Sequence, residues 1–210
     1  MTGIEHLNAG RAETEAPHLD RFERLEPNQL AVAIFILSEV VFFAMLIIAY
    51  IFYRDSPAVA GGPTAKTALD IPLTTLFSIC LFASSGTIWF ADRSLARGNE
   101  NGVRLWLGAT IVLGAVFIGG QGYEYFKLLS EDITLNTNLF GTTFYTLTGF
   151  HGLHVTAGLV ALIILFVLAL MGQFRNVTHN SAMAAISLYW HFVDVVWVVV
   201  FSVVYIWALF

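Results

Sequence analysis

The stretch "LAVAIFILSEVVFFAMLIIAYIFY", residues 30–53, decides the structural class of this chain. It is longer than the roughly 20 apolar residues that a helix needs to cross a bilayer. Its one charged residue is Glu39. Hydrocarbon offers the backbone no hydrogen-bond partner, and the stretch lacks the alternation of a barrel strand. Residues 30–53 are therefore predicted to form a transmembrane helix.

Four more apolar stretches follow, over residues 71–92, 103–126, 140–172 and 184–209. The segment "RDSPAVAGGPTAKTALD" separates the first two, because its Pro and Gly residues break helices. The whole chain of 210 residues is 57% apolar and 12% charged, with a mean hydropathy of +0.74. Soluble domains carry about 25% charged residues. The sequence predicts an all-α integral membrane bundle of five helices, residues 30–210, after a polar tail of residues 1–29.

The positions of Lys and Arg predict the orientation of this bundle, because cytoplasmic segments carry more of them. With the N-terminus inside, the inner segments hold Arg11, Arg21, Arg24, Arg93, Arg97, Arg104 and Arg175. The outer loops hold Arg54, Lys66 and Lys127. We therefore expect a cytoplasmic tail and an outer C-terminus. The chain has no basic run that would favour nucleic acid, and its single Cys80 allows no internal disulfide.

Ionisable side chains inside a span are costly, so each is a candidate functional residue. These residues are Glu39, His151, His154, His191 and Asp194. At about 1.5 Å per residue, Glu39, His191 and Asp194 lie at similar depths, roughly 11–15 Å from the inner face. Spacing of three residues predicts one polar patch at His151–His154 and another at His191–Asp194. Glu124 and Asp92 are near span ends, where an interfacial role is expected.

The buried polar residues allow three interpretations. They can bond across helices and fix the packing, which Gly149, Gly152 and Gly158 favour by allowing close approach. A metal site is a weaker alternative, since the Glu-x-x-His pairs of carboxylate-rich bundles are missing. A lone carboxylate such as Glu39 should hold a proton near neutral pH, which suits a proton-handling group or a partner for histidine. Matching depth makes His191 the predicted partner of Glu39.

Three segments resemble subunit III of the haem–copper respiratory oxidases, the cytochrome c oxidase subunit III family. They are "ILSEVVFFA" around Glu39, "FYTLTGFHGLHVTAGL" at 144–159 and "YWHFVDVVWVVVF" at 189–201. They occur in the family's order, and the resemblance covers residues 28–210. Many members have seven helices. This chain looks like the bacterial five-helix form, which puts the family's internal lipid cleft in doubt.

The resemblance implies a non-redox subunit of a proton-pumping terminal oxidase in the bacterial cell membrane. It implies contact with subunit I, which would hold haem and copper, together with subunit II, cytochrome c as electron donor and bound phospholipid. This chain would hold no cofactor or metal and would have no catalytic activity alone. It would stabilise subunit I and support proton uptake, with Glu39 lying within the membrane.

Three rival functions remain open at this point. They are a quinol-oxidase subunit III, an accessory protein of nitric oxide reductase with the same fold, and a stand-alone transporter. A transporter would more often show internal repeats or broken helices, and neither is evident. Lipid is expected at the subunit boundary near Trp89, Arg93 and Trp207, because cations pair with phosphate and indoles favour the headgroup level.

Overall fold

The computed structural model describes residues 27–54, 65–136, 138–175 and 179–209. Its long helices are α1 (Pro27–Arg54), α3 (Ile71–Ala96), α4 (Glu100–Ser130), α5 (Leu139–Leu170) and α6 (Ser181–Phe201). A single turn, α2 (Ala65–Ala68), precedes α3. The last helix continues as a π-helical turn, η2 (Ser202–Ile206), and a 3-10 turn, η3 (Trp207–Leu209).

Five helices among the described residues are long and apolar enough to cross a membrane, the last running from Ser181 to Leu209. The prediction of an all-helical, multi-pass membrane protein is confirmed. The helices extend beyond the predicted spans; for example, α4 covers residues 100–130 rather than 103–126. Hydropathy misses such polar first and last turns. Residues 1–26 of the predicted tail lie outside the described part, whereas residues 27–29 belong to α1.

Polar caps set the starts of four long helices. Asp70, Asn99, Asn138 and Asn180 each accept a hydrogen bond from the backbone N–H three residues later. Each cap satisfies one of the amides that the first helical turn leaves without a partner. Gly98 joins α3 to α4 with a φ of +66°, a conformation that glycine adopts without steric cost. The short α3–α4 connection turns the chain back into the bundle.

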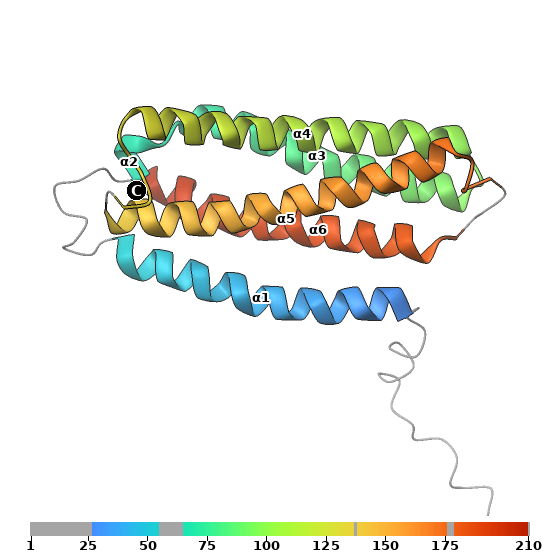
Figure 1. Cartoon of the computed structure of the whole chain (residues 1–210), viewed down its shortest axis with the longest axis horizontal. Helices are drawn as coiled ribbons and strands as arrows, with labels where there is room; N and C mark the ends of the chain where they lie inside the picture. Colours follow the sequence, from blue (N-terminus) through green and yellow to red (C-terminus); the bar gives the residue numbers. More distant parts are fainter. Residues whose placement is uncertain (1–26, 55–64, 137, 176–178, 210) are drawn as a thin grey trace, which may run out of the picture.

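The five helices lie side by side along the long axis of the molecule, with α1 on one flank and α3 and α4 on the other (Figure 1). α3 and α4 form a closely packed hairpin. They approach closely at Gly120, where an added Cβ would lie 2.2 Å from the ring of Phe77. α1 packs mainly against α5 and α6. α6 therefore lies between the flank helix and the hairpin.

Two tryptophans of α6 fill the centre of the bundle. Trp190 and Trp197 are fully buried, and their indole N–H groups donate to Ser84 and Ser78 of α3, each at 2.9 Å. Outward-facing positions are apolar instead: Leu37 is 67% exposed in the isolated chain. Such a surface suits lipid or neighbouring subunits. The two buried indole N–H groups are thus hydrogen-bonded inside the bundle.

Candidate functional site

The first candidate site pairs Glu39 of α1 with His154 of α5. Glu39 Oε2 lies 3.1 Å from His154 Nε2, and both side chains are largely buried. His154 Nδ1 lies 2.7 Å from the carbonyl oxygen of Phe150. The ring of Phe43 packs edge-on against His154 at 5.0 Å between centroids. The pair is therefore oriented by its own helix on one side and shielded by an aromatic ring on the other.

The hydrogen-bond pattern determines where protons sit in this pair. A carbonyl oxygen only accepts, so His154 Nδ1 must carry a hydrogen to bond Phe150. If the imidazole is neutral, its Nε2 is an acceptor and Glu39 must donate. If Glu39 is ionised, Nε2 must be protonated and the ring is charged. Either arrangement gives one hydrogen bond between Oε2 and Nε2.

This geometry corrects the predicted pairing of Glu39 with His191. Glu39 lies 12 residues after Pro27 (39 − 27), and His154 lies 15 residues after Leu139 (154 − 139), so both are near mid-helix. The prediction was wrong because depth along an axis does not say which face of α6 a side chain occupies. His191 bonds toward α3 instead.

The second candidate site joins α6 to α3 through Ser85. Ser85 Oγ donates to Asp194 Oδ2 and lies 3.1 Å from His191 Nδ1. The predicted His191–Asp194 patch is therefore confirmed, with Ser85 as the residue that links its members. One helical turn away, Ser187 donates to Asp92 Oδ2 at 2.5 Å. Asp194 Oδ1 is buried and has no hydrogen-bond partner within the described residues.

His151 does not share a polar patch with His154, so that prediction was wrong. Its side chain is fully buried and stacks on Trp197, with 4.7 Å between ring centroids and 25° between planes. Phe117 packs edge-on against it at 6.0 Å. Neither ring nitrogen has a hydrogen-bond partner in the part of the chain that the structure describes. His151 is a member of the aromatic core, whereas His154 faces α1.

Glu124 is also placed differently from the expected interfacial position. It is only 4% exposed, and both carboxylate oxygens accept hydrogen bonds. Thr74 of α3 donates to Oε1 at 2.9 Å, and Tyr205 donates to Oε2 at 2.8 Å. The π-helical turn η2 shifts the register of the chain end and carries Tyr205 to this position. Distance from a span end does not predict the burial of Glu124, because Thr74 of α3 and Tyr205 of η2 cover its carboxylate.

Sequence reasoning missed Ser85, Thr74 and Tyr205 as partners of buried carboxylates. Small hydroxyl residues are common in α3, and nothing in the sequence separates Ser85 from Ser78 or Ser84.

Asp92 is partly exposed, as an interfacial residue would be. Among the described residues, no group of three or more His, Cys, Asp or Glu side chains is arranged to hold a metal ion.

The residues predicted to contact lipid lie near helix ends. Trp89 and Trp207 are both partly exposed. The guanidinium of Arg93 lies over the Trp89 ring at 5.3 Å, and that of Arg54 lies over the Trp207 ring at 4.4 Å. Cation–π contacts of this kind place a positive charge beside an indole. Lipid binding at these positions stays a prediction.

Comparison with known proteins identifies the family. The family described as "Cytochrome c oxidase subunit III" matches residues 24–209. The chain belongs to this family. It is 39% identical over 182 residues to "Probable cytochrome c oxidase subunit 3" of Mycobacterium leprae, covering 85% of this chain and 88% of the relative. It is 40% identical over 180 residues to "Cytochrome c oxidase subunit 3" of Synechocystis sp., covering 85% of this chain and 75% of the relative.

A third relative gives the same assignment. "Cytochrome c oxidase subunit 3" of Corynebacterium diphtheriae is 37% identical over 183 residues, covering 85% of this chain and 88% of that protein. The family resemblance predicted from the three sequence segments is confirmed. The matched region contains Glu39, His154, Ser85, His191 and Asp194. Both candidate sites therefore belong to the family domain.

Proposed function

We propose that this chain is the non-redox subunit III of a proton-pumping cytochrome c oxidase in a bacterial cell membrane. The complex reduces dioxygen to water with electrons from cytochrome c. Haem and copper are held by partner subunits, and this chain packs against subunit I in a complex that also contains subunit II. Its role is to stabilise subunit I and to support proton uptake, and it is not catalytic alone.

One observation supports the role in proton uptake. The side chains of Glu39 and His154 lie 3.1 Å apart near the middle of α1 and α5, on the flank of the bundle that α1 forms. A proton can move between the carboxylate and the imidazole without leaving a lone buried charge, because the histidine carries the positive charge when the carboxylate is ionised. A proton that leaves the pair leaves the carboxylate charged beside a neutral ring, so it must be replaced for the pair to become neutral again. The partly exposed edge of the pair allows exchange with an adjoining subunit. The names of the relatives favour cytochrome c over quinol as the electron donor.

The proposal includes an orientation and lipid contacts. The N-terminus lies in the cytoplasm, following the excess of Arg in the inner segments. Phospholipid headgroups bind at the subunit boundary near Arg93 with Trp89, and near Trp207, where cations and indoles meet the membrane interface.

The proposal is tested on the native complex after gentle detergent extraction. We expect this chain to co-purify with subunits that show haem and copper spectra and that oxidise cytochrome c. A complex purified from cells lacking the chain should keep these spectra and its initial oxygen consumption. It should take up protons more slowly and lose activity sooner during turnover.

Other outcomes would favour the rival functions. Oxidation of quinol with no copper in subunit II would indicate a quinol oxidase. Co-purification with a nitric oxide reductase, and with no oxidase subunit, would indicate an accessory protein of that enzyme. Solute uptake by vesicles that contain only this chain would indicate a transporter.

A further inference from the structure

The second candidate site reaches the outer surface of the bundle at His191. This residue shares one face of α6 with Leu188, Val195 and Val198, which follow it at helical spacing. The three apolar side chains are exposed, and His191 is partly exposed. We call these four residues the α6 stripe. It is an outward-facing apolar surface that contains one imidazole.

The imidazole lies far from both ends of its helix. His191 is 10 residues after the start of α6 at Ser181 (191 − 181), or about 15 Å along the axis at 1.5 Å per residue. It is 18 residues before the end of this membrane-crossing segment at Leu209 (209 − 191). A side chain at such a position meets acyl chains or neighbouring helices rather than lipid headgroups.

The contacts of His191 with its neighbours define its tautomer. Ser85 Oγ donates its only hydrogen to Asp194 Oδ2, so it accepts at its contact of 3.1 Å with His191 Nδ1. Nδ1 therefore carries a hydrogen, and Nε2 of the neutral ring is an acceptor. Within the described residues Nε2 has no hydrogen-bond partner. The unpartnered polar atoms that are buried there belong to Gln121, His151 and Asp194, so the free Nε2 of His191 faces outward.

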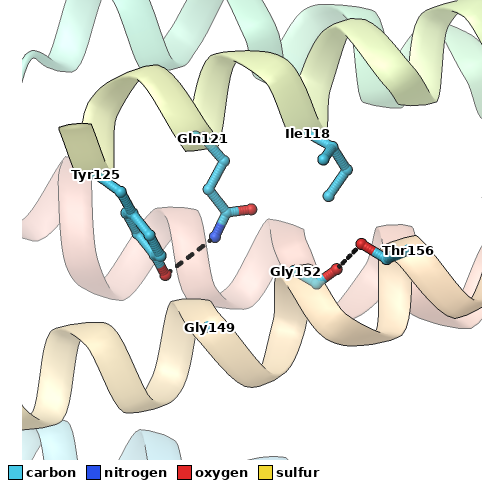
Figure 2. Close-up of a pocket in the computed structure, with 7 residues that line it drawn as sticks. Ile118, Gln121, Tyr125, Gly149, Gly152 and Thr156 are labelled. Atoms are coloured by element: carbon cyan, nitrogen blue, oxygen red, sulfur yellow. Dashed lines mark hydrogen bonds between the residues drawn. The ribbon is translucent and has the colours of Figure 1, made fainter.

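A second unpaired acceptor, on α4, is closed off by the chain itself. Figure 2 shows Gln121 and Tyr125 of α4 facing Gly149 and Gly152 of α5. Gln121 Nε2 donates to Tyr125 Oη at 3.3 Å, and its Oε1 is buried. Of these two acceptors, only His191 Nε2 is open to a group from outside the chain.

Beside the α6 stripe, the backbone of α3 is also open. Ser85 contacts α6, and the next residue, Gly86, is exposed, with nothing within 4 Å of an added Cβ. Trp89, one turn after Ser85, is partly exposed as well. Small residues on a helix surface in a membrane allow another helix to approach closely. A neighbouring helix can therefore reach α3 next to the imidazole.

The occupant of this surface must supply a hydrogen-bond donor within an apolar setting. Ionisable residues inside spans almost always face protein or a water-filled cavity, so an outward-facing imidazole indicates that the α6 stripe is covered in the assembled protein. A lipid acyl chain has no N–H or O–H group to offer. A transmembrane helix with a hydroxyl or amide side chain supplies the donor and packs on the apolar residues.

We propose that a transmembrane helix of a neighbouring oxidase subunit packs on the α6 stripe beside Gly86. A Ser, Thr, Asn or Gln side chain of that helix donates a hydrogen bond to His191 Nε2. The inference rests on the proposed function, because it requires that the chain be part of a multi-subunit oxidase, and it adds the surface through which one contact is made. It does not depend on the role in proton uptake.

Matched glycine substitutions test this surface in the native complex. Gly86→Leu adds a bulky side chain beside the α6 stripe, and Gly119→Leu adds the same side chain on α4. Both glycines are exposed, with nothing within 4 Å of an added Cβ. We expect Gly86→Leu to lower the fraction of this chain that co-purifies with the oxidase by roughly threefold to tenfold, as for one lost intramembrane hydrogen bond with its packing. Gly119→Leu should leave the fraction unchanged, and equal effects of the two substitutions would overturn the proposal.

Replacing His191 with Asn tests the hydrogen bond itself. The amide of Asn can donate to Ser85 in place of Nδ1, but it has no atom at the position of Nε2. We expect His191→Asn to lower the co-purifying fraction by roughly threefold, the effect of one hydrogen bond between membrane helices. The unfolding of the purified chain should change little. An unchanged co-purifying fraction would overturn the proposed hydrogen bond.

A photo-crosslinking residue, p-benzoylphenylalanine, at position 195 identifies the occupant of the α6 stripe. We expect an adduct with a peptide from another oxidase subunit. An adduct with lipid only, or with a second copy of this chain, would overturn the docking proposal. Circular dichroism of each purified variant verifies that it is folded. Failure of the unsubstituted chain to co-purify with any oxidase subunit would instead refute the proposed function, and the docking proposal with it.

Discussion

Replacing Glu39 with Gln or Ala gives the most direct test of the Glu39–His154 pair. Gln has nearly the same size, and its amide N–H can donate to His154 Nε2 while Nδ1 keeps its bond to Phe150. Ala removes the partner altogether. His154 Nε2 then lies in a largely buried position without a hydrogen bond. The two substitutions therefore separate the loss of titration from the loss of the contact.

The expected magnitudes follow from the geometry of the pair. One hydrogen bond of 3.1 Å joins α1 to α5 at this point. Hydrogen bonds between membrane helices average about 0.6 kcal/mol and reach about 1.7 kcal/mol. We expect Glu39→Ala to lower the free energy of unfolding by about 1–1.7 kcal/mol, the upper part of that range, because His154 Nε2 loses its partner in a largely buried position and packing is also lost. Glu39→Gln should lower it by less than about 0.5 kcal/mol.

The assay is reversible unfolding of the purified chain in mixed micelles of mild detergent and dodecyl sulfate, followed by helical circular dichroism. His154→Ala completes a double-mutant cycle with Glu39→Ala. In the complex, Glu39→Gln should leave assembly and initial oxygen reduction nearly unchanged. A coupling below about 0.3 kcal/mol between the two residues would refute the pair as a structural contact. A tenfold loss of turnover or proton pumping in Glu39→Gln would instead identify Glu39 as an obligatory proton carrier, and the structural interpretation would be wrong.

Three other contacts can be tested by substitution, each through the same unfolding measurement. Gly120→Ala should destabilise the α3–α4 hairpin by about 1–3 kcal/mol through overpacking. The control is Gly119→Ala, where an added Cβ meets nothing within 4 Å, and it should be neutral or stabilising by up to about 1 kcal/mol. Equal effects of the two substitutions would refute the close approach of the helices at Gly120. Tyr205→Phe should cost about 1–3 kcal/mol by leaving one oxygen of buried Glu124 without its donor, and a neutral result would place that carboxylate in contact with water. Ser85→Ala should lower the free energy of unfolding by about 1–2 kcal/mol. It should also shift the imidazole nitrogen signals of His191 in nitrogen NMR, and unchanged signals would show that Ser85 does not link His191 to Asp194.

The sequence was sufficient for the helices but not for their contacts. Apolar runs broken by Pro, Gly and polar caps predicted five spans, because the cost of exposing backbone groups to hydrocarbon acts locally along the chain. The pairing of helices depends on their rotation and on which faces meet. The sequence predicts a pair of Glu39 with His191 of α6, whereas the contact is with His154 of α5. α1 packs against both helices, so helix contacts alone do not decide between the two histidines. Hydropathy does not depend on the direction in which a side chain points around the helix axis, so it cannot predict which helix faces meet.

Two further residues show the limit for individual sites. His191 and Asp194 share one helix, and a three-residue spacing was enough to predict that they act together. Glu124 was assigned to the interface from its distance to a span end. Its burial depends on a π-helical turn about 80 residues later in the chain, which changes the helical register near Tyr205. A spacing rule applied within α4 cannot predict that Tyr205, on another segment of the chain, donates a hydrogen bond to Glu124.

The position of α1 on the flank has a consequence for biosynthesis. α1 is the first long helix to be made, yet its main contacts are with α5 and α6, the last two. From Arg54 to Leu209 the ribosome adds 155 residues (209 − 54), which takes roughly 8–30 s at about 5–20 residues per second. During that interval the α3–α4 hairpin can already assemble, since its two helices are neighbours in sequence. Meanwhile α1 lies in the lipid without its main partners, and it completes its contacts with the bundle only when α5 and α6 have been inserted.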